Sequence, residues 1–316
     1  MSENIQILMA TYNAGKWLTP QIESFFEQTY TNWTLLCSDG GSSDGTFEAL
    51  LEWQRRYPDK ICLLPEIGRL GVTANFFRLI QNAKDDAILV FSDQDDVWVP
   101  EKLSTILQET HELDKKQPWL YYGDLYICEG KMEPQKRTFF QKRKLIASFP
   151  DTLPAVVTYP LFNGCTMAIN PVMRSYATDI PVDLLEYWDF ALAIAAYAYG
   201  AVFVRGKKPL IYHRIHQTNY SFLNSISKNF FVRKLEVLQR LKKERIAFTE
   251  MLNAVAFFRK KNFLCMDVKK CSEFDIGLVA DSTFFKRLLV LFPAWFKKLP
   301  FLFLLQRILL FFPVSR

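Results

Sequence analysis

Short apolar runs alternate with amphipathic patterns through the first 92 residues of this chain. The apolar runs have the length of strands and cover residues 5–10, 33–38, 61–64 and 87–92. Patterns with apolar side chains three and four positions apart, typical of helices, fall between them at about residues 16–29, 46–57 and 70–83. This order predicts an α/β fold, a mostly parallel Rossmann-like sheet with helices on both faces. Ligands bind such sheets beyond the carboxyl ends of the strands.

Polar clusters follow each of the four predicted strands. In order along the chain they read "TYN", "DGGSSDGT", "GRLG" and "DQDD". Because parallel strands end at one edge of the sheet, these clusters are expected to share one pocket. The region from 119 to 180 is less regular, and in it "YYGDLYI" and "FNGCTMAIN" are predicted to be strands. A nearly apolar helix over 186–199, ended by Gly200, and a further strand, "AVFV", follow.

The fourth cluster places Asp93, Asp95 and Asp96 within four positions of one another. Carboxylates gathered in this way raise one another's pKa unless a cation lies among them. Mg²⁺ or Mn²⁺ held by one or two carboxylates keeps coordination sites free for diphosphate oxygens. The alternative is that these acids only form a turn and cap the helix predicted after Pro100.

The second cluster contains Asp39 at the end of its strand, where it has no obvious structural task. A carboxylate there can accept the imide N–H of uracil or thymine. Asp44 is expected to be a plain N-cap of the next helix. The chain has neither a P-loop motif nor G-x-G-x-x-G after its first strand, so a nucleoside diphosphate held by a metal ion is the ligand that remains.

Taken together, "ILMATYN", "SDGGSSDGT", "GVTANF" and "LVFSDQDDVWVPEKL" resemble the family-two inverting glycosyltransferases of the GT-A fold. Within that family the chain is most similar to bacterial rhamnosyltransferase-like members. The resemblance covers about residues 4–220 and implies a nucleoside pocket lined by Thr11 and Asp39, with Tyr12 and Asn13 beside them. Ser38 stands where the family's Asp-Asp-Gly pattern has its first Asp.

The resemblance also implies how the donor and its metal ion are held. Asn75 and Asp93 would face the ribose or diphosphate, and Asp95, the last Asp of the family's D-x-D, would bind Mn²⁺ or Mg²⁺. In "YHRIHQTN", Arg214 and His216 match the family's Y-R-x-H segment. His216 can complete the metal shell or contact the diphosphate, and Arg214 can neutralise the charge of the leaving group.

The two residues before Arg214, Tyr212 and His213, are expected to pack or to point outward. The six cysteines of the chain are scattered, and none has a His at metal-ligand spacing in the sequence. They are therefore expected to be reduced thiols, and no zinc site is expected.

An inverting transfer needs one carboxylate that accepts the proton of the attacking hydroxyl. Relatives of this type often have His-Asp-Trp-Trp about a dozen residues before a Gly that closes an apolar helix. Counted back from Gly200, "YWDFALAIAAYAYG" places Asp189 at that Asp, with Trp188 and Phe190 as its altered neighbours. Apolar surroundings would raise its pKa, which suits a base. A charge favoured by the helix dipole is the alternative interpretation of Asp189, and Glu186 and Asp183 are reserve bases.

Three parts are expected: a GT-A domain over 1–224, a helical extension over 225–283 and a membrane-associating tail over 284–316. The whole formal charge of +6 lies in the tail, which has six Lys and Arg and no acid among Phe, Leu and Trp. Its uncharged stretches are too short to cross a bilayer, so the tail is expected to lie on anionic headgroups. Packing on the catalytic domain or in a homodimer interface is the alternative.

No secretory signal is visible, and we expect a cytoplasmic protein, peripheral on the inner membrane face, without nucleic acid partners.

The expected reaction is metal-dependent inverting transfer of a sugar to a lipid-linked or growing cell-surface polysaccharide. The resemblance favours rhamnose from dTDP-rhamnose, and UDP-hexose or UDP-N-acetylhexosamine donors remain open. A nucleotidyl- or phosphoryltransferase would use the same acids, but no Lys/Arg-rich phosphate loop lies near the first strand. A non-catalytic subunit that binds sugar nucleotides stays open because the surroundings of Asp189 are altered.

Overall fold

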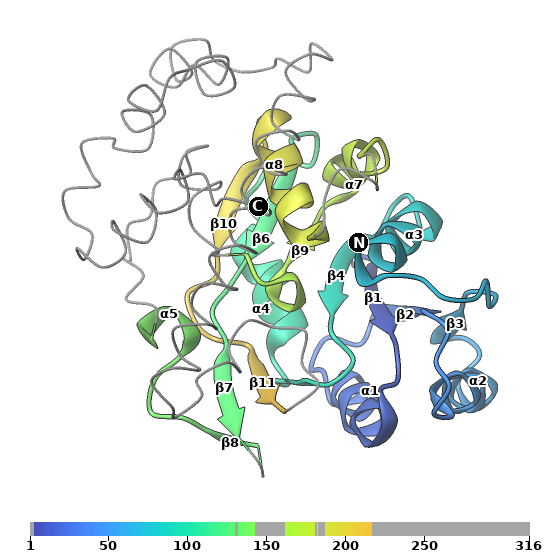
Figure 1. Ribbon diagram of the computed structural model, residues 1–316. Coiled ribbons are helices and arrows are strands. Elements are labelled where there is room, and N and C mark those ends of the chain that lie inside the picture. The colour runs from blue at the N-terminus through green and yellow to red at the C-terminus, as the bar shows by residue number, and fades with distance from the viewer. Residues whose placement is uncertain (1–2, 130–131, 143–161, 181, 183–186, 217–316) are drawn as a thin grey trace, which may run out of the picture.

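The computed structural model describes residues 3–129, 132–142, 162–180, 182 and 187–216 (Figure 1). The predicted boundary near residue 224, the helical extension and the tail lie outside these residues, as do the reserve bases Asp183 and Glu186. In the described part, no helix has both the length and the apolar character needed to cross a membrane.

The first half of the chain forms four parallel strands in the order β3-β2-β1-β4. They are β1 (Ile5–Thr11), β2 (Trp33–Asp39), β3 (Ile61–Leu63) and β4 (Ile88–Ser92). The helices between them are α1 (Leu18–Phe26), preceded by the 3-10 turn η1 (Gly15–Trp17), then α2 (Thr46–Arg56) and α3 (Val72–Asn82). The predicted strand and helix order is confirmed, with ends that shift by a few residues. β4 is buried along its whole length, which explains its continuous apolar sequence.

Three more strands extend the sheet beyond β4. The short β9 (Ala168–Ile169) is antiparallel to β4 and to β6 (Trp119–Tyr122), and β10 (Val202–Arg205) is parallel to β6. The seven-stranded sheet among the described residues is therefore mixed, and the mostly parallel prediction holds outside β9.

The predicted strands "YYGDLYI" and "FNGCTMAIN" were wrong in detail. The first is split at Gly123 into the end of β6 and the start of β7 (Tyr126–Glu129), which belong to different sheets. The second forms the 3-10 turn η2 (Gly164–Thr166) before β9. The two segments meet where the Gly123 N–H donates to Thr166 Oγ1 at 3.2 Å.

A second, four-stranded sheet lies below the carboxyl end of β4 (Figure 1). Its order is β5 (Val97–Trp98), β11 (Ile211–Ile215), β7 and β8 (Glu133–Pro134). Near it lie α4 (Lys102–Thr110) and α5 (Phe139–Lys142). Sequence patterns did not predict this sheet, yet it carries β11, and with it Arg214, to the acidic loop between β4 and β5.

Helices cover both faces of the large sheet, as predicted (Figure 1). α3 packs with α7 (Pro171–Ala177) and α8 (Trp188–Ala198) on one face, while α1 and α2 lie on the other. α8 is buried on nearly every side, consistent with its apolar sequence, and Gly200 follows it with φ of +67°, as expected after a helix end.

Candidate functional site

β1 and β2 end side by side, with Thr11 opposite Asp39 in their register. Thr11 Oγ1 donates a hydrogen bond of 2.8 Å to Asp39 Oδ1. The Asp39 carboxylate also accepts from the backbone N–H of Gly41 at 3.0 Å, and from the N–H and hydroxyl of Ser42 at 2.7 and 2.6 Å. Asp39 therefore holds the turn after β2 closed, and the expectation that it lacks a structural task was wrong.

The loop after β1 connects the two neighbouring loops. The Tyr12 backbone N–H donates to Gln94 Oε1 at 2.8 Å, and its carbonyl accepts from Gln94 Nε2 at 3.0 Å. Asn13 lies in the left-handed region with φ of 48°, and its Oδ1 accepts the Ser43 N–H at 2.9 Å. Tyr12 and Asn13 are exposed, so this loop presents them at the edge of the site.

Asn75 projects from α3 to the end of β2. It is buried, its Nδ2 donates to the Ser38 carbonyl at 2.9 Å, and its Oδ1 has no hydrogen-bond partner among the described residues. Arg78 donates to the Ser38 hydroxyl at 2.8 Å, so a cation of α3 contacts the serine that replaces an acid. Asp44 Oδ1 accepts the Thr46 N–H at 3.1 Å. The N-cap of α2 is Gly45, however, so the prediction that Asp44 is the N-cap was wrong by one residue.

The acidic loop between β4 and β5 meets β11 at Asp95. His216 Nε2 lies 2.7 Å from Asp95 Oδ2, and Arg214 Nε donates to the Asp95 carbonyl at 3.0 Å. Burial, followed by the charge of Asp96, raises the pKa of Asp95. Asp95 and His216 are 121 residues apart in sequence, so the fold brings the two predicted metal ligands together.

Asp96 is paired with His213 in the interior. His213 Nδ1 lies 2.8 Å from Asp96 Oδ1, which also accepts the Arg214 backbone N–H at 3.3 Å. Burial lowers the pKa of His213, but the charge and hydrogen bond of Asp96 raise it to about 9. The raised pKa favours the imidazolium form of His213, and the pair anchors the acidic loop to β11, a role that the sequence analysis missed.

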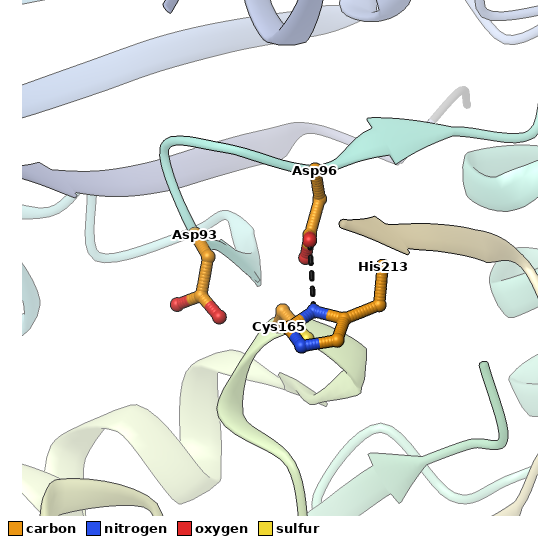
Figure 2. Close-up of side chains that lie close together, drawn as sticks. All are labelled: Asp93, Asp96, Cys165 and His213. Carbon is orange, nitrogen blue, oxygen red and sulfur yellow. Dashed lines mark hydrogen bonds and ion pairs between the residues drawn. The ribbon is translucent and has the colours of Figure 1, made fainter. Parts of the chain in front are cut away.

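Figure 2 shows the side chains of Asp93, Asp96, Cys165 and His213 close together. One possible ligand atom of each lies within 4.8 Å of those of the other three. The fold thus places a cysteine beside a histidine, although the sequence spacing had indicated otherwise. Burial, then the charges of Asp96 and Asp95, raises the pKa of Asp93 to about 8. Burial also raises the pKa of the Cys165 thiol, which is therefore protonated.

Lys102 adds a cation to this cluster. It is 1 % exposed, its Nζ donates to the Cys165 carbonyl at 2.8 Å, and it lies 3.5 Å from the centre of the Trp98 ring. Burial lowers its pKa to about 7, and the charges of Asp96 and Asp93 act in the opposite direction. A Lys in the first turn of a helix interacts unfavourably with the helix dipole. The unusual position of Lys102 at the start of α4 was therefore the sequence signal that could have marked it as a candidate site residue.

Asp189 lies in the first turn of α8 and is half-buried. Its Oδ1 accepts the Phe190 N–H at 2.9 Å and its Oδ2 accepts the Gly164 N–H at 3.2 Å. Burial raises the pKa of Asp189 to about 6, although these backbone donors lower it. The charge of Asp189 raises the pKa of Asp93, so the predicted base and the acidic loop are electrostatic neighbours.

Trp17, in η1, contacts both predicted residues of the last motif. Its ring stacks on the His216 imidazole with centroids 5.3 Å apart, and Arg214 Cζ lies 4.3 Å from the ring centre. Trp17 therefore packs the end of β11 against the loop after β1. The sequence analysis missed it, since an aromatic residue at the start of a helix carries no distinctive pattern.

Among the residues that the structure describes, two sets of side chains could hold a divalent ion, and they differ in chemistry. In the buried set, the pKa values of His213 and of the Cys165 thiol are both raised, so both groups would have to lose a proton before they could bind an ion. Asp95 Oδ2 and His216 Nε2 are 2.7 Å apart, close to the separation of about 3 Å between adjacent ligands of an octahedral ion. The Asp95–His216 pair fits such an ion better, and its imidazole favours a transition metal over Mg²⁺.

The family model described as Glycosyl transferase family 2 matches residues 6–157. The dTDP-rhamnosyl transferase RfbG of Shigella flexneri is 35% identical over 102 residues, which are 31% of this chain and 35% of that protein. The Escherichia coli enzyme WfgD, a UDP-Glc:alpha-D-GlcNAc-diphosphoundecaprenol beta-1,3-glucosyltransferase, is 33% identical over 141 residues, 43% of this chain and 53% of that protein. The chain thus spans about a third and about half of these two relatives.

Solved structures show a similar fold at low sequence identity. Residues 1–349 of Staphylococcus aureus TarS in complex with UDP-GlcNAc align with a TM-score of 0.54 and 16% identity, over 91% of this chain and 78% of that chain. GalNAc-T7 with UDP, GalNAc and Mn²⁺ aligns with a TM-score of 0.53 and 12% identity, over 88% of this chain and 57% of that chain. Both alignments support the same α/β architecture.

Proposed function

We propose that this chain, which carries a family 2 glycosyltransferase domain on a GT-A fold, transfers a hexosyl group from a nucleoside diphosphate sugar with inversion at the anomeric carbon. The observation that carries the proposal is the position of Asp189. Burial raises the pKa of Asp189 to about 6, and the charge of Asp189 raises the pKa of Asp93 in the acidic loop. A base is thus held beside the loop where the diphosphate of the donor would bind.

The donor would bind at the carboxyl ends of β1, β2 and β4. Thr11 and Asp39 shape the nucleoside pocket, and Tyr12 and Asn13 flank it from the exposed loop. Because the Asp39 carboxylate already accepts four hydrogen bonds, three of them from its own turn, it acts mainly by fixing this pocket.

The ribose and diphosphate would be held by residues of α3, the acidic loop and β11. The Oδ1 of the buried Asn75, which has no hydrogen-bond partner within the described part of the chain, would accept from a ribose hydroxyl, and Asp93 would lie next along the pocket. The guanidinium of Arg214 would balance the charge of the departing diphosphate. Asp95 and His216 would hold Mn²⁺ or Mg²⁺, which supplies positive charge to the diphosphate oxygens when bound.

In the transfer step, the acceptor hydroxyl attacks the anomeric carbon from the side opposite the diphosphate. Asp189 accepts the proton of that hydroxyl as the new carbon–oxygen bond forms. The bond between the anomeric carbon and the diphosphate oxygen breaks with its electron pair, and the nucleoside diphosphate leaves as an anion. The Gly164 and Phe190 N–H groups hold the Asp189 carboxylate in place for this step.

Our first choice of donor is dTDP-rhamnose, supported by the similarity to RfbG. A UDP-linked hexose or N-acetylhexosamine is the second candidate, favoured by the name of WfgD and by the UDP-GlcNAc bound to TarS. A lipid-linked glycan is the acceptor that we propose, since the WfgD acceptor is a diphosphoundecaprenol-linked sugar by name. Acting on it would place the protein at the cytoplasmic face of the membrane.

The function is tested by calorimetric titration with dTDP, UDP and GDP, each with Mn²⁺, Mg²⁺ or EDTA. Metal-dependent binding of dTDP in preference to UDP supports rhamnosyl transfer, and a preference for UDP selects the second candidate. Asp95→Asn should abolish metal-dependent binding, whereas Asp189→Asn should keep binding and lose transfer. Equal loss of binding in both variants would contradict the assigned roles, and no binding of any nucleotide would favour a non-catalytic subunit.

Membrane association through residues 284–316 is a separate proposal, and it rests on the sequence of that tail. Flotation with anionic liposomes compares the full chain with a chain that ends at Thr283. We expect only the full chain to float with the vesicles, and less of it as salt is raised. Equal flotation of both would contradict the proposal, and a change in oligomeric state on truncation would favour a homodimer interface instead.

A further inference from the structure

A buried lysine links the acidic loop to the turn that holds the predicted base. Lys102 begins α4, six residues after Asp96, and its Nζ donates to the Cys165 carbonyl at 2.8 Å. Cys165 is the middle residue of η2, and the N–H of the preceding Gly164 donates to Asp189 Oδ2 at 3.2 Å. One lysine is therefore separated from the base by a single 3-10 turn.

The surroundings of Lys102 fix its ammonium group in one place. The side chain is almost fully buried, and the ammonium lies 3.5 Å from the centre of the Trp98 ring. The charges of Asp96 and Asp93 raise the pKa of Lys102 and so favour its charged form. Because a buried ammonium needs a hydrogen-bond acceptor as well as compensating charge, the Cys165 carbonyl is bound to it firmly.

The opposite side of η2 is also fixed, by α8. A Cβ built on Gly164 would lie 2.2 Å from the Trp188 ring, so the turn is in direct contact with the residue before Asp189. The Trp188 ring is stacked on Phe76, with centroids 4.0 Å apart, and packs on Phe91. η2 is thus clamped between Lys102 and α8, and its orientation decides whether the Gly164 N–H reaches Asp189.

We propose that Lys102 is a positioning residue for Asp189, acting through the Cys165 carbonyl and the Gly164 N–H. This inference rests on the proposed function, in which Asp189 is the base. Burial and backbone N–H donors govern the pKa of Asp189, so Lys102 influences it by geometry. Without Lys102, η2 rotates and the hydrogen bond from the Gly164 N–H to Asp189 Oδ2 weakens. The charged form of Asp189 is then less stabilised, and its carboxylate is less well aligned for proton transfer. The charge of Asp189 in turn raises the pKa of Asp93 in the facing loop.

The test compares Lys102→Met with a matched control, Lys60→Met. Lys60 Nζ also donates to backbone carbonyls, those of Thr31 and Trp33, and lies 4.5 Å from the centre of the Trp33 ring. It therefore makes the same types of contact without touching η2. The two variants are compared in the full chain by the pKa of the Asp189 carboxyl from ¹³C NMR, assigned with Asp189→Asn, and by the pH profile of transfer.

For Lys102→Met we expect the pKa of Asp189 to rise by about one unit, since a hydrogen bond to a charged group is lost. We expect kcat to fall about tenfold while the KM of the donor stays within about twofold. Lys60→Met should change neither quantity. An unchanged pKa of Asp189 in folded Lys102→Met, or an equal shift in Lys60→Met, overturns the inference.

If Lys102→Met does not fold, Lys102→Gln takes its place. Its amide keeps a polar group near Asp96 but ends one bond short of the Cys165 carbonyl, so the same shift is expected. The NMR measurement needs no turnover. If the protein transfers no sugar but the pKa of Asp189 shifts in the Lys102 variant, the positioning role stands and the proposed function is wrong. If transfer is normal and the pKa does not shift, the proposed function stands and the positioning role is wrong.

Discussion

The Trp17 indole stacks on the His216 imidazole, with centroids 5.3 Å apart and ring planes 21° from parallel. The guanidinium carbon of Arg214 lies 4.3 Å from the centre of the same indole. Both partners of Trp17 also contact Asp95, through the His216 pair and the Arg214 hydrogen bond to the Asp95 carbonyl. One aromatic residue after β1 thus supports two of the groups proposed to hold the diphosphate and its ion.

Trp17→Ala should weaken Mn²⁺-dependent binding of nucleoside diphosphate by up to about thirtyfold, because aromatic stacking and a cation–π contact are each worth about 1 kcal/mol. Trp17→Phe keeps an aromatic face and should lose no more than about threefold. Calorimetric titration measures both. Trp53→Ala is the control, since Trp53 stacks on Tyr57 and Phe26 away from Asp95. The same loss in Trp53→Ala would show that Trp17 contributes only to general stability.

The pH dependence of transfer should report the state of Asp189. The pKa of this carboxyl is raised by burial to about 6, and a base must be deprotonated to accept a proton. We therefore expect kcat/KM to be level above that pH and to fall about tenfold for each unit below it. Nucleotide affinity measured over the same range separates this effect from protonation of the acidic loop. A decline that begins only near pH 4 would argue against Asp189 as the base.

Asp189 should also cost the protein stability at neutral pH. A carboxyl whose pKa is raised on folding stabilises the folded state below its unfolded pKa, and this stability is lost as the pH rises through the folded pKa. A rise from 3.8 to about 6 corresponds to about 3 kcal/mol. Asp189→Asn should therefore be more stable than the unaltered protein at pH 8, and this advantage should vanish near pH 4. Urea unfolding at both pH values measures the difference, and an Asn variant less stable at pH 8 would contradict the expectation.

The first half of the fold was predictable because each strand and helix there has its own periodic pattern. β1, β2 and β4 are short apolar runs that end in polar clusters, and their parallel order follows from the helices between them. The meeting of Thr11 with Asp39 follows from the same reasoning, since both stand at the ends of neighbouring strands.

The second half depends on contacts between distant segments that leave no local pattern. β11 joins the acidic loop through Asp96 and His213, which are 117 residues apart, and neither residue alone indicates its partner. η2 was predicted as a strand because "FNGCTMAIN" is apolar, but the segment forms a 3-10 turn whose Gly164 packs on the distant Trp188, a contact that the local pattern does not reveal. The structural tasks of Asp39 and Lys102 were missed for the same reason: their partners include backbone groups that no residue type reveals.

Gly164 should not accept a side chain without a rearrangement of its surroundings. A methyl group on it would lie 2.2 Å from Trp188 Cζ2 and 2.9 Å from Cη2, so Gly164→Ala must displace the indole or the turn. Overpacking of this kind destabilises by about 1–3 kcal/mol. Because the Gly164 N–H donates to Asp189, we also expect transfer to fall by more than the folded fraction does.

Trp188→Phe supplies the matched rescue, since it removes the part of the indole that the new methyl group would strike. Gly164→Ala combined with Trp188→Phe should therefore recover part of both stability and transfer, giving a coupling energy of about 1 kcal/mol or more. Gly71→Ala is the control, because a methyl group on Gly71 would meet no atom within 4 Å and its φ of −68° suits any residue. Thermal unfolding and donor turnover measure the cycle. Strictly additive effects of the two substitutions would mean that the Gly164–Trp188 contact does not set the position of Asp189.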